Sequence, residues 1–211
     1  MICVSIGDCS VEECIKSLQG LELAEIRMDK MKLSEEEVRK IFPQKLKLIA
    51  TCRATKTLND NERKKLLLAA IDAGAAYVDI EVESSDTYKK EILSKAKSKG
   101  CKVIISYHNY EQTPQKGELE QIVDWCFDSG ADIAKIACKV NSEKDNARLL
   151  GLLDSDRKII AIGTGEKGKI TRVLGPLLGS PFTYASLKKG KETAEGQIGH
   201  NKLKELMGLL K

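Results

Sequence analysis

The feature that most constrains this chain is a repeated unit in which an amphipathic stretch ends at a glycine and an apolar, β-rich run follows. Gly74 precedes the run 77–82, Gly100 precedes 102–108, Gly130 precedes 132–138, and Gly20 precedes a similar run at 21–29. The later glycines are 26 and 30 residues apart, a spacing that fits one strand plus one helix rather than a hairpin. Because glycine readily adopts the left-handed conformation that ends many helices, the pattern predicts alternating helices and strands.

Along the whole chain, this pattern predicts eight strands, at 2–6, 23–28, 47–52, 77–82, 102–107, 133–138, 158–163 and 182–187. It predicts helices near 10–19, 34–41, 60–73, 86–98, 118–129, 142–152, 167–178 and 200–210. Eight alternating units of this kind are typical of an α/β protein with a single (β/α)8 TIM barrel, here one domain over residues 1–211. An open doubly wound sheet is the competing topology, but no G-x-G-x-x-G phosphate-binding pattern follows the first strand.

Charge and cysteine content narrow the expected partners. The 35 basic and 31 acidic residues are interspersed and leave a net charge of +4, and aromatic residues are few, so nucleic acid is not an expected partner. No apolar run approaches the roughly 18 residues of a spanning helix and the start shows no leader pattern, so no membrane association is expected. The seven cysteines form no C-x-x-C pair and are expected to be free thiols. Together these features predict a cytoplasmic protein.

Several predicted strands carry polar residues toward their carboxyl ends, although strands buried on both faces are usually apolar. Residues two apart in a strand point to the same side. The pairs are Glu25 with Arg27, Thr51 with Arg53, Asp79 with Glu81 and Ser106 with His108, and Lys135 stands alone in an apolar run. Because active-site loops follow the carboxyl ends of barrel strands, these residues predict a catalytic site. A buried salt-bridge network with only a packing role is the alternative.

Lys135 is the most informative of these residues, because most lysines lie on the solvated surface. Desolvation within the strand and nearby Arg cations favour its neutral amine, which can attack a carbonyl carbon and form a Schiff base. His108 ends the preceding predicted strand, and neighbouring strands lie about 4.8 Å apart. The pair therefore predicts an amine nucleophile beside a general acid and base. A hydrogen-bonded core histidine is the alternative for His108.

The sequence predicts no metal centre. The chain has two histidines and neither an H-x-H nor an H-E-x-x-H pattern, so a zinc site is not expected. Magnesium between Glu25, Asp79 and Glu81 stays open, although interleaved Arg27 and Arg53 can neutralise those carboxylates without a metal.

Two glycine-containing loops follow the last two predicted strands. In GEKGKITR (165–172) the glycines loosen the backbone before Thr171 and Arg172, which predicts an arginine delivered to an anion. The second, KKGKETAEGQIG (188–199), is either a solvated connector or a lid over the barrel mouth.

Five motifs, in order along almost the whole chain, resemble those of the type I 3-dehydroquinate dehydratases of the shikimate pathway. ELAEIRMD resembles the second-strand E-x-R-x-D motif of that family, ISYHNY its catalytic histidine strand and ADIAKIA its Schiff-base lysine strand. GEKGKITR is similar to its G-x-x-G-x-[ST]-R carboxylate-binding segment, and TAEGQ to its closing S-x-x-G-Q loop. Each motif is weak alone, whereas five in sequence on eight matching strands are specific.

The resemblance implies a role for each matched position. Lys135 is expected to form an imine with the substrate ketone, and His108 to abstract a proton and then protonate the leaving hydroxyl. The expected substrate-binding residues are Ser5, Glu25, Arg27, Arg53, Arg172, Thr193 and Gln197, with Arg172 and Gln197 at the carboxylate. The implied reaction is syn elimination of water from the small molecule 3-dehydroquinate to give 3-dehydroshikimate, without a cofactor, in a homodimer.

Three positions depart from the family pattern. The usual glutamate that pairs with the catalytic histidine is Thr57 here, so we expect Glu81 or Glu62 to orient His108 instead. Thr164 stands where methionine is common, and Thr193 replaces the closing-loop serine but keeps its hydroxyl. The alternatives to the dehydratase are a class I aldolase or transaldolase on the same barrel, which would need a phosphate site after strands seven and eight, and a catalytically silent barrel that binds a small acid or a protein.

Overall fold

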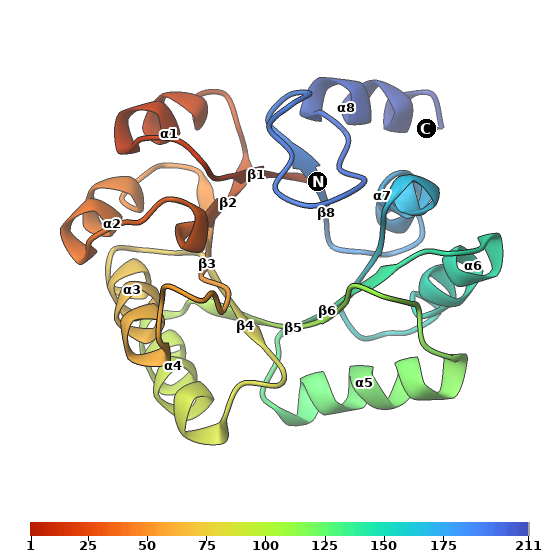
Figure 1. The fold of residues 1–211 in the computed structure, drawn as a ribbon, viewed down its shortest axis with the longest axis horizontal. Coiled ribbons are helices and arrows are strands. Elements are labelled where there is room, and N and C mark those ends of the chain that lie inside the picture. Colours follow the sequence, from red (N-terminus) through yellow and green to blue (C-terminus); the bar gives the residue numbers. More distant parts are fainter. Residues whose placement is uncertain (211) are drawn as a thin grey trace.

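In the computed structural model, which describes residues 1–210, all eight predicted strands are present. They are β1 (Ile2–Ile6), β2 (Leu23–Arg27), β3 (Lys47–Thr51), β4 (Tyr77–Glu81), β5 (Lys102–Asn109), β6 (Ile133–Lys139), β7 (Ile159–Thr164) and β8 (Thr183–Ser186). The largest difference from the predicted bounds is at β5, which continues two residues further and so includes His108 within the strand. The barrel prediction is confirmed, with helices surrounding the strands (Figure 1).

The eight strands form one parallel sheet in the order β7-β6-β5-β4-β3-β2-β1-β8, so the barrel is nearly closed and its seam lies between β7 and β8. Helix α7 (Lys169–Leu174) supplies polar contacts to both seam strands. The Gly163 amide of β7 donates to Thr171 Oγ1 at 2.7 Å, and the Tyr184 carbonyl of β8 accepts from Arg172 at 3.3 Å. Side chains of α7 therefore satisfy backbone groups at the seam.

The other helices are α1 (Val11–Ser17), α2 (Glu35–Ile41), α3 (Asp60–Asp72), α4 (Asp86–Lys99), α5 (Lys116–Asp128), α6 (Glu143–Gly151) and α8 (His200–Gly208). Reciprocal capping boxes start α1, α2 and α3, where a Ser or Asn caps the helix and a Glu three residues on bonds back. The glycines of the repeat all have positive φ, between 67° and 101°, as predicted. No helix within residues 1–210 is long and apolar enough to cross a membrane.

The helix predicted over 167–178 is broken in the structure. Two short 3₁₀ segments, η2 (Glu166–Gly168) and η3 (Gly175–Leu177), flank α7. Pro176 lies at the start of η3, where it has no N–H to continue the α-helical hydrogen bonds.

The barrel interior changes from apolar to polar along the strands. The lower layers contain a buried apolar cluster that includes Leu23, Ile49, Ile104 and Phe182. Two residues further along β2 comes the buried Glu25, and the same step along β5 leads to Ser106. Because side chains two apart share a face, the strands that close the core below also place polar groups above it.

Candidate active site

Lys135 lies at the centre of the polar layer, 6% exposed on β6. Its Nζ donates a hydrogen bond to Asp79 Oδ2 at 2.9 Å and lies 3.6 Å from Glu25 Oε1. The ring of Tyr184 covers the same nitrogen, with 4.1 Å between Nζ and the ring centroid. The expected surroundings, an apolar strand and nearby Arg cations, are therefore incomplete, because two carboxylates contact the amine directly.

Asp79 links Lys135 to the neighbouring strands. Its carboxylate pairs with Arg53 at 2.8 Å and accepts a hydrogen bond from Ser106 Oγ at 2.6 Å, while Arg53 also donates to Ser106 at 2.8 Å. Burial alone would raise the pKa of Asp79, but the charges of Arg53 and Lys135 outweigh it and hold the pKa below its ordinary value. Asp79 is thus an ionised counter-charge beneath the site.

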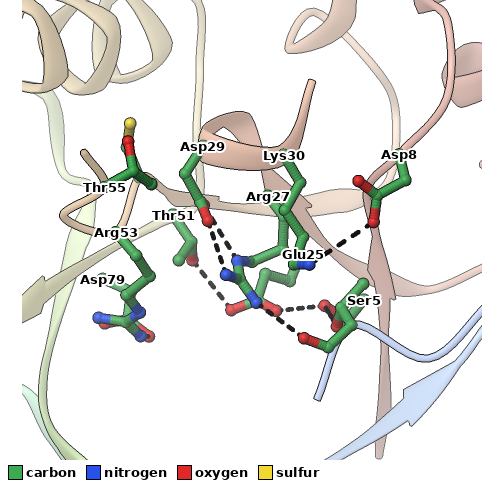
Figure 2. A network of polar contacts seen from close by, with 12 residues as sticks. Ser5, Asp8, Glu25, Arg27, Asp29, Lys30, Thr51, Arg53, Thr55 and Asp79 are labelled. Carbon is green, nitrogen blue, oxygen red and sulfur yellow. Dashed lines mark hydrogen bonds and ion pairs between the residues drawn. The ribbon is translucent and has the colours of Figure 1, made fainter. Parts of the chain in front are cut away.

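Glu25 provides the second carboxylate near Lys135. Figure 2 shows it between Ser5 and Thr51. Ser5 donates to one carboxylate oxygen, and Thr51 donates to the other at 3.0 Å. Arg27 donates two hydrogen bonds to the Asp29 carboxylate, at 3.0 and 2.7 Å. Neighbouring side chains therefore fix the orientations of both carboxylates, Glu25 and Asp79.

His108 lies on β5 two residues beyond Ser106, which is in register with Lys135. Burial lowers the pKa of His108 below its ordinary value, and the Arg53 and Lys135 charges lower it further. The imidazole is therefore neutral at pH 7 and can accept a proton.

The expected carboxylate partners of His108 lie elsewhere. Glu81 pairs with Arg63 of α3, and Glu62 bonds back to the Asn59 amide at 2.9 Å in the capping box of α3. The prediction that one of them orients His108 is wrong, because each is already engaged by α3. The imidazole of His108 is stacked against the ring of Tyr110, with ring centroids 6.1 Å apart.

Arg172 reaches the site through a close approach of two backbone segments. A Cβ on Gly168 would lie 2.3 Å from the Gly163 carbonyl carbon, and Thr171 Oγ1 bridges the two glycines, donating to the Gly168 carbonyl at 2.8 Å. The expectation that glycines loosen this loop is therefore wrong here: they permit tight packing that fixes the start of α7.

Arg172 is 1% exposed, and its guanidinium pairs with backbone carbonyls and with no carboxylate among residues 1–210. It donates to the carbonyls of Tyr184 at 3.3 Å and Glu195 at 3.2 Å, and its Nε has no partner. Burial lowers the pKa of Arg172 to about 10. A buried cation without a counter-charge is costly, so this position favours an anionic ligand.

The loop 188–199 covers the mouth of the barrel rather than extending into solvent. Thr193 Oγ1 donates to Ser5 Oγ at 2.7 Å, and its backbone N–H donates to Gln197 Oε1 at 2.8 Å. Arg27 holds the Thr193 carbonyl at 3.3 Å, and Lys139 pairs with Glu195. Of the two alternatives for this loop, these contacts favour the lid.

These groups enclose a cavity of about 300 Å³. All the predicted site residues except Ser5 line it: Glu25, Arg27, Arg53, His108, Lys135, Arg172, Thr193 and Gln197. Ser5 lies behind Glu25 and bonds to it. Tyr110, Lys139 and Tyr184 also line the cavity, and the sequence motifs assign them no role. For Tyr184, alternation with Ser186 in the predicted strand 182–187 is the signal that places it inside the barrel.

No group of three or more His, Cys, Asp and Glu side chains within residues 1–210 is arranged to hold a metal ion. The three carboxylates considered for magnesium are paired with cations instead. Glu25 and Asp79 contact Lys135, and Glu81 pairs with Arg63.

Comparison with known proteins identifies the family that shares this geometry. A family model described as type I 3-dehydroquinase matches residues 2–211. The 3-dehydroquinate dehydratase of Methanocaldococcus jannaschii is 39% identical, with 100% of this chain and 99% of that protein covered. This chain belongs to the type I 3-dehydroquinase family.

Solved structures of the family agree. The type I 3-dehydroquinate dehydratase of Clostridium difficile, determined with covalently modified comenic acid, has a TM-score of 0.87 and 27% identity over 99% of this chain and 91% of that one. The Aquifex aeolicus enzyme has a TM-score of 0.81 and 32% identity over 98% and 96% of the two chains. The predicted resemblance is confirmed.

The departures from the family pattern have distinct places in the structure. Thr57 is exposed, with its backbone N–H on Thr55 Oγ1 at 3.3 Å, so it does not replace the missing glutamate in the cavity. Thr164 lines the cavity. Thr193 uses its hydroxyl within the lid, as described above.

Proposed function

We propose that this chain, as one barrel domain over residues 1–211, dehydrates 3-dehydroquinate to 3-dehydroshikimate through an imine on Lys135. Membership of the type I 3-dehydroquinase family supports the substrate. The observation that carries the mechanism is the buried amine of Lys135, which lines one cavity together with a neutral imidazole and an arginine that has no counter-anion.

The reaction begins when Nζ of Lys135 attacks the ketone carbon. The carbonyl oxygen leaves as water, and the resulting iminium draws electrons from the neighbouring carbon. His108 takes a proton from that carbon and forms an enamine and an imidazolium. The imidazolium then protonates the departing hydroxyl, which leaves as water. Hydrolysis of the conjugated iminium releases the product and restores the lysine.

Arg172 and Gln197 are proposed to bind the substrate carboxylate, since a guanidinium fork matches both carboxylate oxygens. Glu25, Arg27, Arg53 and Thr193 are proposed to contact the ring hydroxyls. Ser5 is proposed to act through Glu25, whose carboxylate it orients, and through Thr193. This arrangement places the anionic end of the substrate near the lid and its ketone toward β6.

Borohydride reduction tests the proposal. Reduction in the presence of 3-dehydroquinate should inactivate the enzyme and add one ligand mass to the peptide that contains Lys135, and borohydride alone should do neither. Lys135→Met preserves the length of the side chain without the amine, so it should fold and lose nearly all turnover, measured by the enone absorbance of the product. A label on another lysine, or full turnover in the variant, would refute the proposed mechanism.

We further propose that the enzyme acts in the cytoplasm, without a cofactor, as a homodimer. All seven cysteines are free, which is typical of reducing compartments. The dimer follows from the family resemblance. Light scattering of the purified protein tests it, and a monomeric mass in the presence of substrate would refute it.

A further inference from the structure

Tyr184 contacts the proposed nucleophile directly, although no motif in the sequence marks it. It lies on β8, 2% exposed, and packs against Phe182 with ring centroids 5.7 Å apart. Its own ring faces Lys135 Nζ at 4.1 Å from the centroid. A cation within about 6 Å of an aromatic face is attracted to it, and more strongly where both are desolvated.

Three groups therefore surround Nζ below the cavity. Asp79 contacts it at 2.9 Å, Glu25 lies at 3.6 Å and the ring of Tyr184 closes a further side. Each of the two carboxylates is itself fixed by neighbouring side chains, as is the tyrosine ring by Phe182. A ketone can therefore approach Nζ only from the cavity that Lys135 lines.

We propose that the face of Tyr184 positions Lys135 Nζ for attack and then contacts the iminium cation that forms on this nitrogen. This inference rests on the proposed imine at Lys135. It names a residue from β8 that positions the reacting nitrogen, separate from the residues that bind the substrate.

The ring of Tyr184 can attract the nitrogen of Lys135 both as the ammonium of the free enzyme and as the iminium, because each is a cation. Overall, an ammonium and a ketone yield an iminium and water. The ammonium first gives up a proton, the neutral amine then bonds to the ketone carbon, and the carbonyl oxygen leaves as water with two of the three original protons. The net positive charge of one is on the nitrogen before and after this step. The ring face therefore contacts a cation before and after this step, while the amine that attacks is neutral. The contribution of the ring is to the placement of Nζ, where a displacement of about 1 Å can slow a reaction by about a hundredfold.

The hydroxyl of Tyr184 plays no part in this role. It has no hydrogen-bond partner among residues 1–210, so Tyr184→Phe keeps the ring and removes only an unpaired polar group. Tyr184→Leu removes the aromatic face and leaves an apolar side chain. The two variants separate the ring from the hydroxyl.

The experiment measures the rate of imine formation. Enzyme is mixed with 3-dehydroquinate, samples are quenched with borohydride at set times, and mass spectrometry gives the fraction of protein that has trapped the ligand. Tyr184→Leu should slow trapping five- to thirtyfold, because Nζ loses the ring that holds it in place and a displacement of about 1 Å can cost up to about a hundredfold in rate. Tyr184→Phe should stay within twofold of wild type. Binding of shikimate, which has the carboxylate and hydroxyls but no ketone, should change less than threefold in both variants.

The trapping experiment distinguishes failure of the Tyr184 inference from failure of the proposed imine mechanism. Absence of trapping in the wild-type enzyme would refute the imine mechanism itself. Wild-type trapping with an equal rate in Tyr184→Leu, or an equal loss in Tyr184→Phe, would overturn the inference about the ring. Circular dichroism verifies the fold. Tyr184→Met, whose side chain is similar in volume to leucine but more flexible, is measured in the same way if the Leu variant does not fold.

Discussion

Replacing Arg172 should separate ligand binding from stability, because its guanidinium is buried without a counter-anion. We consider two variants. Arg172→Lys keeps a charge but loses the planar fork, and Arg172→Met removes the charge while preserving most of the length of the side chain. Both leave the Gly163, Gly168 and Thr171 contacts that fix the start of α7.

The magnitude follows from the contacts of Arg172. Burial lowers its pKa from 12.5 to about 10, which corresponds to about 3 kcal/mol against the charged form. Its hydrogen bonds to the Tyr184 and Glu195 carbonyls offset this by about 1 kcal/mol each. Removing the charge should therefore stabilise the ligand-free protein by about 1 kcal/mol, or roughly 2–4 °C in Tm for a chain of this size.

Ligand binding should change in the opposite direction. Loss of the bidentate carboxylate contact should weaken binding by about 2 kcal/mol, or roughly thirtyfold in KM for Arg172→Lys, and by at least as much for Arg172→Met. Calorimetric melting without ligand gives the first quantity, and steady-state kinetics give the second. A KM within threefold of wild type would remove Arg172 from the carboxylate site, and a Met variant that melts several degrees lower would refute the argument about its uncompensated charge.

Two further predictions concern the base and the lid. The pKa of His108 lies below its ordinary 6.5, so its neutral form should persist from pH 7 down to about 6. We therefore expect kcat to stay constant over this range and to fall in stronger acid. A decline of kcat already between pH 8 and 7 would contradict this. Gly196→Ala should raise KM on the order of tenfold, because a Cβ there would lie 2.3 Å from the Gly165 carbonyl oxygen and φ is 73°. Gly190→Ala, with φ of 83° but open space around it, is the matched control, and equal KM values in the two variants would refute docking of the lid at Gly196.

Local patterns were sufficient to predict the architecture. The glycines before the strands have the positive φ expected of helix ends, and capping residues such as Ser10 and Asn59 start helices near the predicted positions. The two-residue period also placed Glu25 and Lys135 inside the barrel, one step along their strands from Leu23 and Ile133 of the apolar cluster. These features depend on residues within a few positions of one another, so the sequence contains the information that determines them.

Contacts between strands could not be predicted in the same way. They depend on strand register, on side-chain rotamers and on which of several possible partners lies within hydrogen-bonding distance. Glu81 was expected to face His108 but is paired with Arg63 of α3, and Ser5 lies behind Glu25 rather than in the cavity. Asp79 contacts Lys135 from two strands away on one side, and Tyr184 of β8 covers the same amine from beyond β7 and the seam. Folding brings these distant residues within 3–4 Å of one another, where burial strengthens each interaction, and that proximity creates the site.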